Sequence, residues 1–94
     1  MSNAELLKAF KADQGVGGTY HDEKIQLYID EVKEYLLGAG VDSTVIESKH
    51  AKGVILRGMS DLWNSGAGDV KFSTYFMQRA TQLSYETVEV SDGE

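Results

Sequence analysis

The stretch GAGDVKFSTYFMQRATQL, residues 66–83, decides the fold predicted for this chain. It opens with a glycine-rich turn, after which Ser73 stands where its side chain can accept hydrogen bonds from the free backbone N–H groups of a first helical turn. Apolar residues then recur at steps of four, four and three, which places them on one helix face: Phe72, Phe76, Ala80 and Leu83. We therefore expect a helix over 73–83 whose apolar face lies in the core.

Two residues of this helix, Tyr75 and Arg79, lie beside the apolar face and are not required by the core. Trp63, near the end of the preceding apolar segment, is a third residue of this kind. Aromatic side chains and arginine are the residues that most often anchor protein interfaces. We predict that Trp63, Tyr75 and Arg79 contact a partner.

Two helices are predicted in the first part of the chain. A short one runs over 3–12 with Ser2 or Asn3 as its cap, and the glycines of 14–19 end it in a turn. A longer one runs over 22–37, with an acidic first turn that complements the helix dipole. Its apolar residues recur at steps of four, three and four: Ile25, Ile29, Val32 and Leu36.

A third helix is predicted between these two and the 73–83 helix. Thr44 and Glu47 match a capping box, so the helix is expected to start there and to continue to about Asn64. Gly53 and Gly58 fall inside it, and each weakens a helix interior by about 1 kcal/mol relative to alanine. We therefore expect a neighbouring helix to approach closely at both glycines.

These segments predict an all-α fold, a small antiparallel bundle of three to four helices. The chain has 94 residues, which corresponds to one domain. We assign residues 1–83 to this domain and 84–94 to an acidic C-terminal tail that includes Glu86 and Glu89. Because the tail contains four acids and no base, we expect it to be flexible.

Composition excludes several classes of function. The chain contains no cysteine, so disulfides, thiolate nucleophiles and cysteine-ligated metals are ruled out. With 15 acidic and 9 basic residues, its net charge of −6 disfavours general binding to nucleic acid. It has neither an apolar run long enough to cross a membrane nor a secretory signal pattern, and so it is expected to be intracellular.

No catalytic, cofactor-binding or metal-binding residue is predicted. The glycines of 15–19 precede a helix but lack the Gly-Lys-Ser/Thr ending of a nucleotide loop. His21, Asp22 and Glu23 are consecutive in sequence, and their side chains would diverge on a helix. His50 has no second histidine at four-residue spacing, and no serine lies in a nucleophile elbow.

A helix-turn-helix is an alternative interpretation of the second and third helices. Lys49, Lys52 and Arg57 would then supply contacts to bases or phosphates. These three residues form a loose stripe in an acidic domain, whereas DNA-binding domains carry a basic footprint. A small helical DNA-binding regulator and an accessory protein–protein interaction domain both remain as alternatives.

The order of these helices and two strings of sequence carry a family resemblance. The strings are DLWNSG at 61–66 and VKFSTYFMQRATQL at 70–83. Together they make the chain, over about residues 6–83, similar to the small head–tail connector proteins of tailed bacteriophages and prophages, also called adaptors. Members of that family often carry proline after the serine, where this chain has Thr74.

The resemblance implies a structural protein and not an enzyme. Connectors of this kind form a homo-oligomeric ring beneath the portal protein, extend the DNA channel and offer a platform to the next tail component. DNA would be passing cargo, and the protein would act at the virion head–tail interface after assembly in the host bacterial cytoplasm. On this basis Trp63, Tyr75 and Arg79 are expected to contact a subunit or the portal, and the tail with Glu86 and Glu89 is expected to remodel on assembly.

Overall fold

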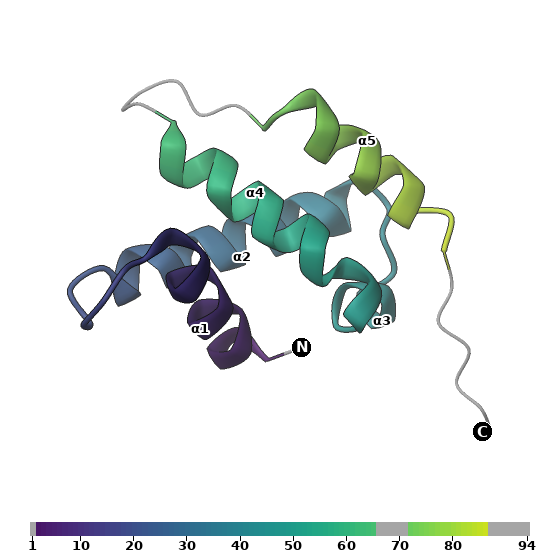
Figure 1. Ribbon diagram of the computed structural model, residues 1–94. Coiled ribbons are helices and arrows are strands. Elements are labelled where there is room, and N and C mark those ends of the chain that lie inside the picture. The colour runs from purple at the N-terminus through teal and green to yellow at the C-terminus, as the bar shows by residue number, and fades with distance from the viewer. Residues whose placement is uncertain (1, 66–71, 87–94) are drawn as a thin grey trace.

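The computed structural model describes residues 2–65 and 72–86, and these residues form helices and turns without a strand (Figure 1). The predicted all-α fold is confirmed. The elements, in chain order, are α1 (Asn3–Gln14), α2 (Asp22–Gly38), α3 (Ser43–Ile46), the 3₁₀ helix η1 (Lys49–Ala51), α4 (Lys52–Asn64) and α5 (Thr74–Leu83). Residues 87–94 of the predicted tail lie outside the described residues.

The core lies where α2 meets the helices packed against it. In Figure 1, α1 and α4 cross in front of α2, and α5 lies along the other side of α4. Every predicted apolar face supplies residues that are at most 3% exposed, and no polar side chain of the described residues is buried. The largest fully buried side chains are Phe10, Phe76, Leu6, Ile25, Ile29, Leu36, Ile55, Met59 and Leu83.

Serine caps two of these helices, as predicted. Ser2 forms a complete capping box with Glu5: its Oγ accepts the Glu5 N–H at 3.1 Å, and Glu5 Oε1 accepts the Ser2 N–H at 3.0 Å. Ser73 Oγ accepts the Phe76 N–H at 3.1 Å and so starts α5. Gly15 ends α1 with φ +69°, a backbone conformation that favours glycine.

The prediction of one unbroken helix from Thr44 to Asn64 is wrong. The segment divides into α3, η1 and α4, and the cap of α3 is Asp42, whose carboxylate accepts the Thr44 N–H at 2.8 Å. Ser48 marks the break, because its hydroxyl donates to the Val45 carbonyl at 2.6 Å and accepts the His50 N–H at 3.2 Å.

Burial explains why the chain bends there. On a straight continuation of α4, Val45 and Ile46 would lie about 140° and 120° from Gly58 around the helix axis, outside the arc that α4 buries. In the bent chain they are 0% and 2% exposed. The break therefore turns two large aliphatic side chains into the core, a gain of about 1.5–3 kcal/mol for each.

The two glycines of α4 differ. A Cβ added at Gly58 would meet Phe76 Cε1 at 2.6 Å and Val32 Cγ2 at 3.0 Å, so the predicted close approach is confirmed there. A Cβ at Gly53 would meet no atom within 4 Å, and the same prediction is wrong for Gly53. Only Gly58 is required by packing within the subunit.

The cap of α3 leads to a pH-dependent prediction. The hydrogen bonds that Asp42 accepts from the side chain and then the backbone of Thr44 lower its pKa below the ordinary value of 3.8. A carboxyl with a lower pKa in the folded state adds stability that is complete above its unfolded pKa and is lost as the pH falls through the folded pKa.

Asp42→Asn keeps a capping oxygen but does not titrate. We therefore expect the free energy of unfolding of this variant to fall less steeply below about pH 4 than that of the parent chain. Urea unfolding followed by circular dichroism over a pH series measures this slope. If the free energy of unfolding falls equally steeply below about pH 4 in the two proteins, the prediction is contradicted.

Candidate interaction surface on α4 and α5

Asp61 on α4 fixes the start of α5. Its Oδ2 accepts the Ser73 N–H at 2.9 Å, and its Oδ1 lies 3.3 Å from Nε of Arg57, one turn earlier on α4. The Asp61 side chain is 12% exposed, while that of Arg57 is 48% exposed, so water reaches the contact from the arginine side. One carboxylate therefore joins the N-terminus of α5 to α4.

Arg57 continues this network to Tyr75. Its guanidinium lies 5.3 Å from the centre of the Tyr75 ring, within the range of a cation–π contact. The Tyr75 side chain is nevertheless 56% exposed. An aromatic ring is thus held in place on one side and open to solvent on the other.

Beneath this surface, three aromatic rings hold α5 against the core. Phe72 stacks on Phe76 with ring centres 4.5 Å apart. Tyr35 on α2 lies 4.8 Å from Phe72 and 5.5 Å from Phe76. Phe76, Ala80 and Leu83 are buried, as the spacing predicts, while Phe72 is half-buried.

Arg79 lies one helical turn after Tyr75 and is half-buried. Its guanidinium donates a hydrogen bond to Gln82 Oε1 on the same helix. The cation over the Tyr75 ring is therefore Arg57 of α4 and not Arg79. Tyr75 and Arg79 remain on one side of α5, as their four-residue spacing requires.

Trp63 belongs to a different part of the molecule. Its ring makes edge contacts with Phe10 at 5.5 Å, His21 at 5.4 Å and Tyr28 at 6.5 Å between ring centres. The Lys24 ammonium lies 5.4 Å from the Trp63 ring centre. Trp63 thus joins α4 to α1 and α2, and the structure does not bring it together with Tyr75 and Arg79.

Of the two predicted tail residues, Glu86 and Glu89, the structure describes only Glu86. Glu86 is half-buried, and its Oε1 lies 3.5 Å from Nδ1 of His50 in η1. Glu89 lies outside the described residues. The start of the predicted tail is therefore linked to the N-terminal end of α4.

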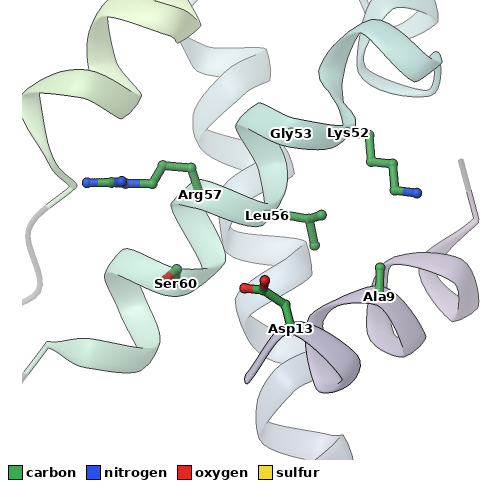
Figure 2. Close-up of a pocket in the computed structure, with 7 residues that line it drawn as sticks. All are labelled: Ala9, Asp13, Lys52, Gly53, Leu56, Arg57 and Ser60. Carbon is green, nitrogen blue, oxygen red and sulfur yellow. The ribbon is translucent and has the colours of Figure 1, made fainter. Parts of the chain in front are cut away.

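A shallow groove runs between α1 and α4. Figure 2 shows Ala9 and Asp13 facing Leu56 across the gap, with Lys52 and Arg57 pointing away from one another along α4. The hollow measures about 490 Å³ and is completed by Gly53 and Ser60. A second hollow of about 370 Å³ adjoins it and shares two of its lining residues; it is lined by Glu5, Lys8, Ala9, Ala12 and Lys52.

Sequence reasoning missed Asp61 and the role of Arg57 at this surface. Their four-residue spacing on a helix was a visible signal for an ion pair. Their contacts with Ser73 and Tyr75 depend on how α5 packs, and no local pattern indicates that. Over residues 2–65 and 72–86, no group of three acidic or histidine side chains is placed to hold a metal ion.

Comparison of the chain with protein-family models, with curated proteins and with solved structures gives no match. No helix within the described part of the chain has the length and apolar character needed to cross a membrane.

Proposed function

We propose that this chain is a structural head–tail connector of a tailed bacteriophage or prophage. It assembles as a ring beneath the portal, extends the DNA channel and carries the next tail component. In this role the domain is a small antiparallel bundle whose acidic tail, 84–94, becomes ordered on docking. The protein acts at the virion head–tail interface after assembly in the host bacterial cytoplasm, and it catalyses no reaction.

The exposed Tyr75 ring, held by Arg57, is the observation that carries this proposal. A side chain already oriented before binding loses less conformational entropy when a partner covers it. Aromatic and arginine side chains are also the commonest hot spots of protein interfaces. Tyr75 and Arg79 are therefore the residues proposed to meet the portal or a neighbouring subunit.

The net charge supports the same role. A domain with a charge of −6 repels the phosphate backbone, which favours passage of DNA over retention. The alternative of a DNA-binding regulator has less support, since Arg57, one of its three proposed basic residues, is engaged by Asp61 and Tyr75. An accessory interaction domain would use the same surface for a different partner.

Co-assembly with a phage portal protein tests the proposal. Tyr75→Ala combined with Arg79→Ala should weaken docking by at least about tenfold, the effect expected when interface anchors are lost. Truncation after Leu83 should impair docking as well. Portal binding is measured by co-sedimentation and by electron microscopy of the complexes.

Tyr20→Ala is the matched control, because Tyr20 is 90% exposed in the turn before α2, where its ring contacts that of His21. It should dock like the parent chain. Circular dichroism should first establish that all variants are folded. Normal docking by both the double variant and the truncated chain would overturn the assignment of this surface.

A further inference from the structure

The outer face of α2 is acidic and exposed. The inner face buries its four aliphatic residues, so the opposite side of the helix projects away from the core. Leu27 lies at the middle of that side and is 66% exposed. Exposed acids surround it at helical spacing: Glu23, Asp30, Glu31 and Glu34. We call these five residues the acidic α2 face.

These acids are almost free of internal pairing. Asp30 accepts a long hydrogen bond of 3.5 Å from the Asn3 side chain. Among the described residues, Glu23, Glu31 and Glu34 make no ion pair. Four negative charges therefore surround an exposed leucine. A surface complementary to them would carry the opposite charge and a hollow for an aliphatic side chain.

The groove between α1 and α4 has both properties. Lys8 and Lys52 stand at one end, and neither forms an ion pair with any residue in the described ranges. The floor consists of small or aliphatic residues: Ala9, Ala12, Gly53 and Leu56. Arg57, Glu5 and Asp13 also line the two hollows, so the groove carries three basic and two acidic side chains. Its net charge is therefore opposite to that of the acidic α2 face.

Gly53 is a second reason to expect a partner surface in this groove. It lies in the first turn of α4, where glycine is a poorer helix former than alanine. Packing within the subunit does not call for it, because a Cβ added there would meet no atom within 4 Å. Because Gly53 has no side chain, the groove stays open at this point to the surface of another molecule.

We propose that the acidic α2 face of one copy lies in the α1–α4 groove of a second copy. Leu27 then enters the hollow over Gly53, and the flanking glutamates face Lys8 and Lys52. The inference rests on the proposed ring, for which it names the contact between subunits. It commits to a second copy because both halves of the complementary pair are present on each chain.

The position of the two surfaces determines the type of assembly. α1 and α4 cross in front of α2 in Figure 1, and the groove lies between them, whereas the acidic α2 face is the side of α2 turned away from its buried residues, so the two are different surfaces of the chain. A contact between two different surfaces is heterologous, and its repetition closes into a ring when the rotation per subunit allows it. The proposed pairing is therefore head-to-tail.

Charge reversal provides the first test. The groove variant Lys8→Glu with Lys52→Glu and the face variant Glu31→Lys with Glu34→Lys should each self-associate at least about tenfold more weakly than the parent, because like charges then oppose each other. An equimolar mixture of the two should regain association, since each acidic groove now meets a basic face. Sedimentation velocity over a concentration series measures all four samples.

Cross-linking provides the second test, and the absence of native cysteine makes it specific. A chain with Leu27→Cys mixed with a chain carrying Ala9→Cys should form a disulfide-linked 1:1 dimer under mild oxidation. The control mixture replaces Leu27→Cys with Tyr85→Cys, at a residue that is 84% exposed elsewhere, and should give far less dimer. Both mixtures are tested with and without the portal protein.

The outcomes separate this inference from the proposed function. Portal docking and ring formation that persist in both reversal variants, without a Leu27–Ala9 cross-link, would overturn the pairing and leave the connector role intact. Rescue in the mixture without any portal binding would support the pairing and count against the connector. Loss of association only on truncation after Leu83 would identify the acidic C-terminal segment as the occupant of the groove and overturn the inference.

Discussion

Gly58→Ala should destabilise the domain by about 1–3 kcal/mol, although alanine is the better helix former, because the added methyl group overpacks the core. The new Cβ would lie 2.6 Å from Cε1 of Phe76, far inside contact distance. Phe76 cannot swing away, since its ring is buried, stacks on Phe72 and makes a tilted contact with Tyr35. Gly58→Leu should have a larger effect and prevent α5 from docking.

Gly53→Ala is the matched control on the same helix. It should stabilise the monomer by up to about 1 kcal/mol, because the new side chain meets open space and lowers the entropy of the unfolded chain. Urea unfolding followed by circular dichroism, at a concentration where the chain is monomeric, compares the two variants. Combining Gly58→Ala with Phe76→Leu should recover part of the loss. Equal effects at the two glycines would contradict the packing argument.

Trp63→Ala should lower the free energy of unfolding by about 2–4 kcal/mol, within or slightly below the range for a fully buried aromatic residue. The substitution removes the edge contacts with Phe10, His21 and Tyr28 and the stacking surface for Lys24. Because Trp63 is half-buried, the remaining cavity can partly fill with water. Since it is the chain's one tryptophan, unfolding must be followed by circular dichroism and not by fluorescence.

Two further variants show whether Trp63 is chiefly a packing residue. Trp63→Phe keeps a ring in the cluster and should retain most of the stability, while Tyr75→Ala, at an exposed ring, should cost less than about 1 kcal/mol. A Trp63→Ala chain that keeps its stability but fails to dock on the portal would instead support the predicted interface role of this residue.

The helices flanking the core could be predicted because their signals are local. Ser2 and Ser73 stand before apolar residues at helical spacing, and each caps its helix as expected. The break at Ser48 could not be predicted, since the residues around it suit a helix and contain no proline. Burial of Val45 and Ile46 decides it, and burial depends on helices remote in sequence.

Only those features of the candidate surface that follow from helical spacing could be predicted from the sequence. The exposed position of Tyr75 follows from the burial of Phe76 beside it. The contact of Tyr75 with Arg57 and the place of Trp63 among rings of α1 and α2 are tertiary, so sequence spacing carries no information on either. For the same reason Gly53 and Gly58 gave identical signals in the sequence, although only Gly58 faces another helix.

The contact between Gly58 and Phe76 also has an evolutionary meaning. The two positions lie on different helices, yet the ring of one occupies the space that a side chain of the other would need. Gly58 is not free to change first, because a larger residue there needs a smaller residue at position 76. Phe76→Leu would therefore be the permissive first step, and we expect substitutions at the two positions to occur in that order.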